Sequence, residues 1–137
     1  MGRPIVEFEL SNYRDIHDAE MGRISPDKIR KITLTGVVDT GAARLVLPAG
    51  VAQFLGLPSD GESIVRYADH HRERRAMAKD AFIRLEGRTG VFKAILEPAR
   101  TDALLGAIVM EDLDLLVDCT NLRVFRRDPN TIITEVE

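Results

Sequence analysis

The sequence predicts an all-β fold, a small closed barrel or sandwich that carries two short helices. Short apolar runs recur along the chain and are separated by glycine, proline, aspartate and asparagine, which is typical of strands joined by turns. The clearest example is the stretch 86–90, Glu-Gly-Arg-Thr-Gly, where two glycines between apolar runs indicate a hairpin. The 137 residues contain no repeat, low-complexity tract or linker, so we expect one domain over 1–137.

The predicted strands either alternate apolar and polar residues or are short and apolar throughout. Residues 5–10 alternate apolar with acidic side chains, which indicates a half-buried strand. In residues 29–38, the side chains of Ile32, Leu34 and Val38 share one face. The other strands are expected over 45–47, 64–67, 75–78, 81–85, 91–96, 113–117 and 122–125.

One helix is expected to begin at Pro48, because proline at the first helical position loses no hydrogen bond that the helix needs. Its apolar side is formed by Val51, Phe54 and Leu55. The stretch 56–58, Gly-Leu-Pro, is typical of a helix end. We therefore interpret this helix as core packing.

Residues 12–28 are polar and predict a long loop or a short helix over 15–21. Within this segment, His17, Asp18 and Glu20 lie close enough to suggest a metal site. A solvated charged loop is the better interpretation, because no second ligand cluster offers the usual spacing. No metal and no cofactor is expected.

The charge balance disfavours two classes of partner. The formal charge of −3 comes from 19 basic and 22 acidic residues, which argues against a dominant nucleic-acid or membrane partner. The single cysteine, Cys119, rules out an intrachain disulfide and suits a reducing compartment, so a cytoplasmic location is expected. No apolar run approaches the ~18–20 residues that span a bilayer.

The most informative stretch surrounds Asp39. An apolar run that includes Val37 and Val38 leads into Asp39 and then into a turn over 40–42, and a second apolar run follows over 45–47. A carboxylate at the end of a buried strand is costly unless it is hydrogen-bonded or paired. On these residues alone, an ordinary turn that supplies those hydrogen bonds is the better interpretation; a catalytic site is the other.

The run Val-Asp-Thr-Gly-Ala at 38–42 resembles the active-site loop of retroviral-type (retropepsin-like) aspartic proteases. A second mark of that family is a pair of apolar residues and a glycine that lead into a short helix, and Leu104-Leu105-Gly106 is similar to it. The following helix and a strand that ends in Asp118 resemble the cellular and bacterial branch. The resemblance covers residues 31–126 and implies a small closed barrel with two short helices.

The resemblance also implies an aspartic endopeptidase that acts as a homodimer on peptide or protein substrates. Two carboxylates held ~3 Å apart share one proton, because both cannot ionise at that separation. Asp39 and its copy would activate a water, Thr40 would brace the loop across the two-fold axis, and Gly41 would allow close approach of substrate. The implied substrate-contacting residues are Ala42, Ala43, Tyr67, Ala68, Leu104 and Leu105.

The chain differs from the viral members of that family at two places. Ala43 stands where they usually carry an acidic residue, and Ala107 and Ile108 stand where they carry arginine followed by asparagine or aspartate. In the viral enzymes those positions hold the substrate backbone and join the subunits. The resemblance therefore does not carry these contacts over to this chain.

Residues 64–67 and 75–78 predict the two arms of a hairpin, and 59–62 predict a turn before it. In the family this position holds the flap, a mobile hairpin that closes over bound peptide and excludes water. The tip lacks the glycine that family flaps often carry. Only Tyr67 offers aromatic stacking, so a solvated flap that favours acidic substrate residues is a better interpretation of its basic cluster than nucleic-acid binding. The cluster comprises Arg66, His70, His71, Arg72, Arg74 and Arg75.

Two other functional classes remain open. A non-catalytic peptide-binding or dimerisation module could bind extended peptide by strand addition, although such a module has no need of Asp39. A purely structural β-domain would make Asp39 a turn residue. Other nucleophiles are disfavoured, because Cys119 lacks an obvious histidine partner and Ser59 and Ser63 lack a Gly-x-Ser-x-Gly context.

Overall fold

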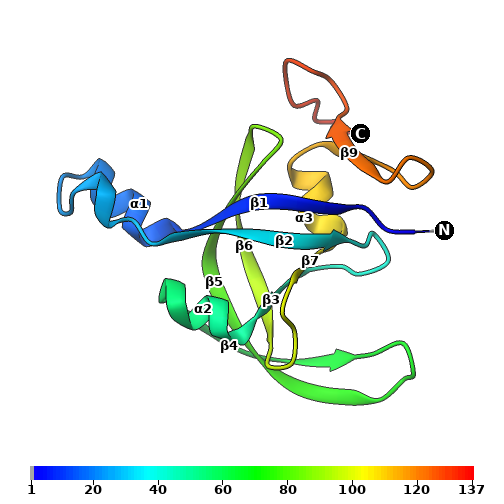
Figure 1. Ribbon diagram of the computed structural model, residues 1–137, viewed down its shortest axis with the longest axis horizontal. Helices are drawn as coiled ribbons and strands as arrows, with labels where there is room; N and C mark the ends of the chain where they lie inside the picture. Colours follow the sequence, from blue (N-terminus) through cyan, green and yellow to red (C-terminus); the bar gives the residue numbers. More distant parts are fainter. Residues whose placement is uncertain (1) are drawn as a thin grey trace.

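The computed structural model describes residues 2–137 and contains a closed β-barrel (Figure 1). The strands are β1 (Ile5–Asn12), β2 (Lys31–Val38), β3 (Leu45–Pro48), β4 (Ser59–Arg66), β5 (Arg72–Leu85), β6 (Arg88–Glu97), β7 (Ala103–Leu105), β8 (Leu115–Asp118) and β9 (Arg123–Arg126). Six of them follow the order β1-β2-β7-β3-β6-β5, and β5 pairs with β1 to complete the ring. The expected all-β closed barrel is therefore confirmed.

Apolar side chains that alternate inward along each strand fill the barrel. Leu10 on β1 pairs in register with Ile32 on β2 and with Ile83 on β5, and neither Leu10 nor Ile83 has exposed surface. Leu45 and Leu47 on β3 are buried in the same way. Each such side chain stabilises the fold by about 1.5–3 kcal/mol relative to an exposed one.

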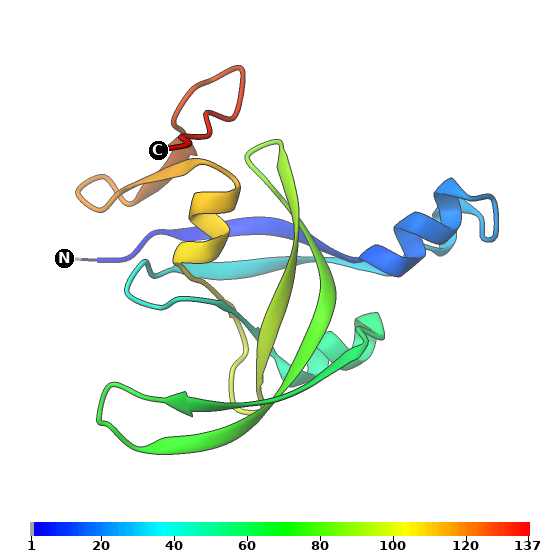
Figure 2. The same ribbon diagram turned by 180° about the vertical axis from the view of Figure 1, so that it is seen from behind.

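A long hairpin of β4 and the first half of β5 extends away from the barrel (Figures 1 and 2). We call β4, the tip over 67–71 and the first half of β5 the flap hairpin. β5 continues into the barrel, with a register shift between Ala78 and Ala81. The turn expected over 59–62 is wrong, because these residues belong to β4, where a register shift and the positive φ of Gly61 (77°) accommodate the irregularity.

The second hairpin has a tighter turn than the sequence suggests. The expected five-residue connection is only Glu86-Gly87, with φ values of 51° and 74°, so β6 begins at Arg88. Two consecutive residues with positive φ form the type of turn whose twist matches that of paired strands.

The helices are α1 (Tyr13–Glu20), α2 (Ala49–Leu55) and α3 (Ala107–Asp112), with a 3-10 turn η1 (Pro26–Lys28). The structure thus has one helix more than the two expected, because the segment predicted as loop or helix forms α1. This helix begins after Asn12, whose side-chain oxygen accepts a hydrogen bond from the Asp15 amide at 3.1 Å.

Helix α2 buries two of the three predicted apolar side chains. Leu55 is buried and Val51 packs against the core as expected, whereas Phe54 is 65% exposed, so its assignment to the apolar side is wrong, and Ala52 is buried in addition. Pro48 ends β3 rather than lying in the first helical turn. Gly56 ends the helix as expected, with φ of 64°.

The chain after α3 forms a separate two-stranded sheet, β8-β9, followed by an extended C-terminal segment that we call the tail (127–137). The buried Arg88 side chain fixes the tail by donating hydrogen bonds to the carbonyl oxygens of Leu113, Asp114, Asp128 and Thr131. Within residues 2–137 there is no helix of the length and apolarity needed to cross a membrane.

Candidate active site

Asp39 lies immediately after β2 and is held by the loop that follows it. Its amide donates to the carbonyl oxygen of Leu105 on β7 at 3.0 Å, and its own carbonyl oxygen accepts the Ala42 amide at 3.1 Å. The carboxylate oxygen Oδ1 accepts the Gly41 amide at 3.0 Å. The side chain is 22% exposed, so the second oxygen, Oδ2, is left for contacts outside the loop.

The two sequence motifs meet at this loop. The first amides of α3 hold it, since Ala107 donates to the Ala42 carbonyl at 2.8 Å and Ile108 donates to the Ala43 carbonyl at 3.0 Å. A Cβ on Gly106 would lie only 2.5 Å from the carbonyl oxygen of Arg44, so only glycine fits there. Because the two α3 amides donate to them, the carbonyl oxygens of Ala42 and Ala43 already have hydrogen-bond partners within the chain.

Arg3 forms an ion pair with Asp39 that the sequence does not predict. Its guanidinium nitrogen NH1 lies 3.5 Å from Asp39 Oδ2, and the Val38 amide fixes the N-terminal segment by donating to the Pro4 carbonyl at 2.9 Å. The Arg3 side chain is 63% exposed, so water screens this ion pair and it contributes little to stability.

Three half-buried apolar side chains lie side by side next to Asp39, and we call them the outer patch. Val37 pairs in register with Leu104, and Leu104 pairs with Val46. Paired residues share a face of the sheet, and their neighbours Val38 and Leu105 face the buried core. Leu105 is fully buried, so the prediction that its side chain contacts substrate is wrong. Leu104 stays a candidate, and Val37 and Val46 join it.

The flap hairpin presents two different faces. Arg66 and Arg72 are cross-strand partners, as are Ile64 and Arg74, and all four are exposed. Tyr67 and Arg75 belong to the opposite face and reach Glu97 on the barrel, so the exposed arginines lie on the outer face. These arginines therefore do not support the expectation that the flap favours acidic substrate residues.

Glu97 joins the flap hairpin to the barrel and is absent from the sequence-predicted residues. The Tyr67 hydroxyl donates to Glu97 Oε2 at 2.5 Å, and Arg75 Nε donates to Oε1 at 2.5 Å. Burial and this hydrogen bond to Glu97 raise the pKa of Tyr67, and the hydrogen bond to Glu97 also raises the pKa of Arg75. In the sequence, the only sign of Glu97 is that a charged residue stands at the end of an apolar run.

Ala68, which the resemblance implies as a substrate-contacting residue, is exposed at the flap tip.

Comparison with solved structures identifies the fold as that of a retroviral protease. The EIAV protease complexed with the inhibitor HBY-793 superposes with a TM-score of 0.57 at 17% identity, covering 81% of this chain and 88% of that chain. The solution structure of the simian foamy virus (mac) protease matches with a TM-score of 0.45 at 14% identity, covering 57% and 80%. No protein-family model and no curated protein matches the sequence.

Proposed function

We propose that this protein is an aspartic endopeptidase that hydrolyses peptide bonds with a water activated between Asp39 and the Asp39 of a second subunit. The observation that carries the proposal is the placement of Asp39 in a retroviral-protease fold. Its backbone is fixed to β7, and its Oδ1 is fixed by Gly41. The remaining oxygen pairs with the largely exposed Arg3 guanidinium, which moves aside or shares the oxygen when a water binds, and the adjoining outer patch is available to a peptide.

The chemistry needs two carboxylates because water is a weak nucleophile and the leaving amine needs a proton. One Asp39 takes a proton from the water as it attacks the carbonyl carbon, and the other, protonated, donates to the carbonyl oxygen. As the C–N bond then breaks, the first carboxyl gives its proton to the leaving nitrogen and the second takes one back from the diol hydroxyl. The pair titrates as a unit. A single chain has one such loop, so the reaction requires a two-fold homodimer.

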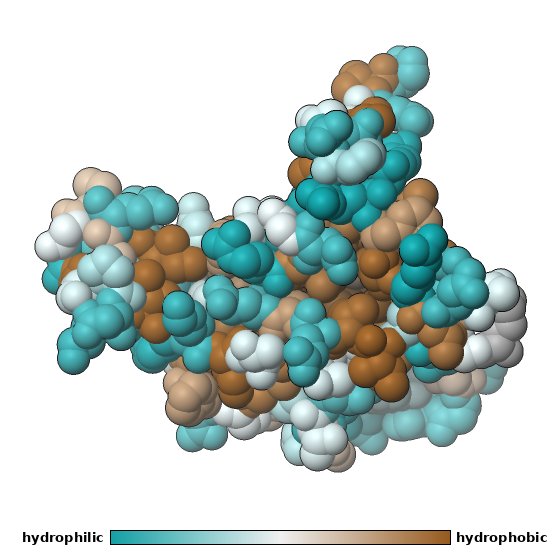
Figure 3. All heavy atoms as spheres, turned by 45° about the horizontal axis from the view of Figure 1, so that its top comes forward, coloured by the Kyte–Doolittle hydropathy of each residue, from teal (hydrophilic) through white to brown (hydrophobic). Residues whose placement is uncertain are grey.

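The surface beside Thr40 supports the dimer proposal. A hollow of about 1070 Å³ begins at Thr40 and runs between α3, β8 and the tail. Apolar side chains that line or flank it are exposed: Ile108, Leu116, Ile132 and Ile133. Hydrophobic residues also reach the surface elsewhere among hydrophilic ones on the face that Figure 3 shows. A second subunit that covered this side would bring both Asp39 loops together.

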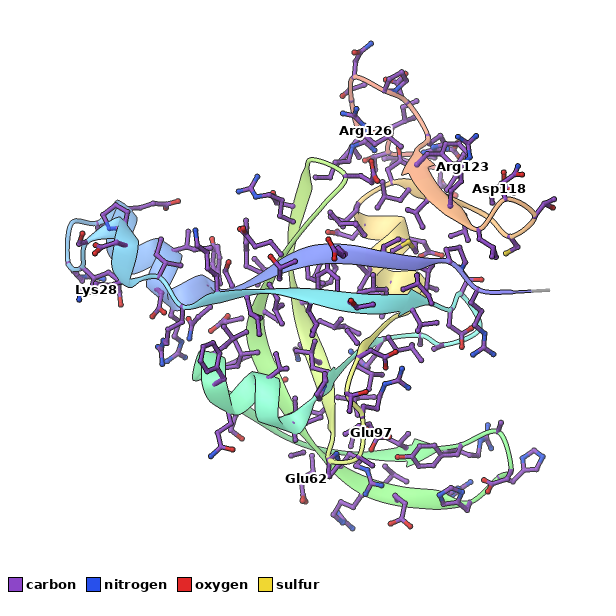
Figure 4. The ribbon with its side chains drawn as sticks, viewed as in Figure 1. Lys28, Glu62, Glu97, Asp118, Arg123 and Arg126 are labelled. Carbon is purple, nitrogen blue, oxygen red and sulfur yellow. The ribbon has the colours of Figure 1, made fainter. Side chains whose placement is uncertain are left out.

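The test is cleavage of a proteome-derived peptide mixture at mildly acidic pH, with products identified by mass spectrometry. The wild-type protein should generate new peptide termini. Asp39→Asn should abolish them, because it removes the shared proton while changing little volume. Asp18→Asn is the matched control, since Asp18 lies on α1 and pairs with Arg23, and this helix projects at the end of the barrel away from β7 (Figures 1 and 4).

The controls also separate the alternatives. Full cleavage by the purified Asp39→Asn protein would contradict the assignment of Asp39. Peptide binding without cleavage by the wild type would instead support the non-catalytic peptide-binding module.

A further inference from the structure

Near its tip, the flap hairpin is joined to the barrel through the carboxylate of Glu97, in addition to the Asp60–Lys93 ion pair and the pairing of β5 with β6 at its base. Glu97 is the last residue of β6, pairs in register with Pro48 of β3, and is only 14% exposed at its side chain. Both of its carboxylate oxygens are used, one by the Tyr67 hydroxyl and the other by Arg75 Nε. Glu97 lies beside the flap hairpin in Figure 4.

The Tyr67 ring is itself held on both the tip side and the β5 side. The His71 ring stacks on it with centroids 4.5 Å apart and planes 9° apart, and the Arg75 guanidinium lies 5.9 Å from its centroid. The Tyr67 hydroxyl, whose pKa is raised by burial and by Glu97, donates a hydrogen bond to the Glu97 carboxylate. The tip and the fastening point therefore form one cluster.

The tip has no glycine to make it flexible. Residues 67–71 turn through hydrogen bonds between the Tyr67 amide and the His71 carbonyl, and between the His70 amide and the Tyr67 carbonyl. His70 adopts the left-handed conformation with φ of 71°. Any movement of the tip relative to the barrel would have to break the contacts that Tyr67 and Arg75 make to Glu97.

We propose that Glu97 is a positioning residue that sets the position of the flap hairpin over the Asp39 site through Tyr67 and Arg75. The contact is broken when the flap opens to admit a peptide and is made again when the flap closes. Peptide affinity then depends on it, whereas the chemical step at Asp39 does not. The proposal rests on the proposed peptidase function for its effect on substrate, but the fastening itself can be measured without substrate.

The outer face of the same hairpin provides matched controls. Glu62 and Arg74 form an ion pair of 3.6 Å with side chains 57% and 66% exposed. This pair has the same charges as Glu97 and Arg75 but lies within the hairpin and does not join it to the barrel. Glu62→Gln therefore removes one carboxylate from the flap hairpin without removing its attachment.

The direct test is amide hydrogen exchange in the free protein for wild type, Tyr67→Phe, Glu97→Gln and Glu62→Gln. Tyr67→Phe removes one oxygen and keeps the ring, so the fold should persist. We expect the Tyr67 and His70 amides to exchange about 10-fold faster or more in Tyr67→Phe and Glu97→Gln. Glu62→Gln should match the wild type, and amides between β5 and β6 should be unchanged in all four. Unchanged exchange at the tip in Tyr67→Phe would overturn the proposal.

The second readout is peptide hydrolysis. Glu97→Gln should raise KM about 10-fold and leave kcat within about two-fold, because it weakens an interaction that serves bound peptide and transition state equally. A loss confined to kcat would overturn the positioning role. If the wild-type protein cleaves no peptide, the proposed function fails, and the exchange measurement still decides whether Glu97 fastens the flap hairpin.

Discussion

At the scale of single residues, three partly buried carboxylates show two different arrangements. Asp39 accepts a backbone amide from its own loop and leaves one oxygen for outside contacts. Asp15 is surrounded by donors of Arg30, and Asp114 accepts the Ile133 amide and pairs with Arg127 at 2.8 Å. The first arrangement keeps a carboxylate accessible for chemistry, whereas the second holds segments of the chain together.

The Asp15 contacts predict a dependence of stability on pH. The hydrogen bond from the Arg30 side chain lowers the pKa of Asp15 from its ordinary value, although burial opposes this. A carboxyl whose pKa is lower in the folded state stabilises the fold above its unfolded pKa of about 3.9, and this contribution is lost as the pH falls through the folded pKa. Asp15→Asn should therefore cost about 1–2 kcal/mol at neutral pH, since Arg30 is half exposed and its charge is screened.

Denaturant unfolding at neutral pH and at a pH below the folded pKa checks this expectation. The difference between wild type and Asp15→Asn should shrink towards zero in acid, where Asp15 is protonated in both folded and unfolded protein. Asp18→Asn, on the same helix but more exposed, should differ little from wild type at either pH. A difference of equal size at both pH values would show that packing, not charge, is responsible.

At the scale of elements, the Asp39 loop and α3 behave as one unit. Neither can be placed without the other, because the loop carbonyls are the hydrogen-bond partners of the first α3 amides and Gly106 fits against the loop backbone. Most of the barrel strands lie between the two motifs in the sequence. The contact between the Asp39 loop and the start of α3 gives a physical reason why the chain carries both motifs.

Gly106→Ala should therefore damage both stability and activity. The added Cβ would meet the Arg44 carbonyl oxygen at 2.5 Å and must push the loop outward, at an expected cost of about 1–3 kcal/mol. Peptidase activity should fall by more than the loss of folded protein explains, because Asp39 moves with the loop. Thermal unfolding and peptide cleavage measured on the same preparation check both effects.

Gly50→Ala is the matched control, since Gly50 lies in α2 with no atom within 4 Å of the added Cβ. Alanine in a helix should stabilise the protein by about 0.5–1 kcal/mol and leave cleavage unchanged. A Gly106→Ala protein as stable and active as wild type would contradict the conclusion that the Asp39 loop and α3 behave as one unit.

The sequence predicts these elements well where the signal is local. Alternation along 5–10 and the Val-Asp-Thr-Gly run depend on neighbouring residues, so β1 and the Asp39 loop follow directly. The outward position of Phe54 does not follow from neighbouring residues, because the face that α2 buries is set by its contact with the barrel. Glu97 is hidden for the same reason: its partners Tyr67 and Arg75 reach it only through the course of β5 past β6.

At the scale of the whole molecule, the barrel holds the Asp39 loop between two projecting parts. The flap hairpin extends on one side, and the β8-β9 sheet with the tail stands on the other (Figures 1 and 2). Closure of six strands leaves no free edge within the barrel itself, so the loop rests on a rigid frame. In the proposed mechanism, the second subunit would approach from the side of Thr40 and the tail, and the peptide would lie between the flap hairpin and the Asp39 loop.

The measurement that tests the shared-carboxylate mechanism most directly is subunit mixing. Wild-type chains are combined with a nine-fold excess of Asp39→Asn chains under conditions that allow exchange, and peptide cleavage per wild-type chain is followed. Random pairing into two-fold dimers leaves only about a tenth of wild-type chains with a wild-type partner, so activity per wild-type chain should fall to about that fraction. The same excess of Asp18→Asn chains should not lower it. Activity that tracks only the amount of wild-type chain would show that each subunit works alone and would contradict the mechanism.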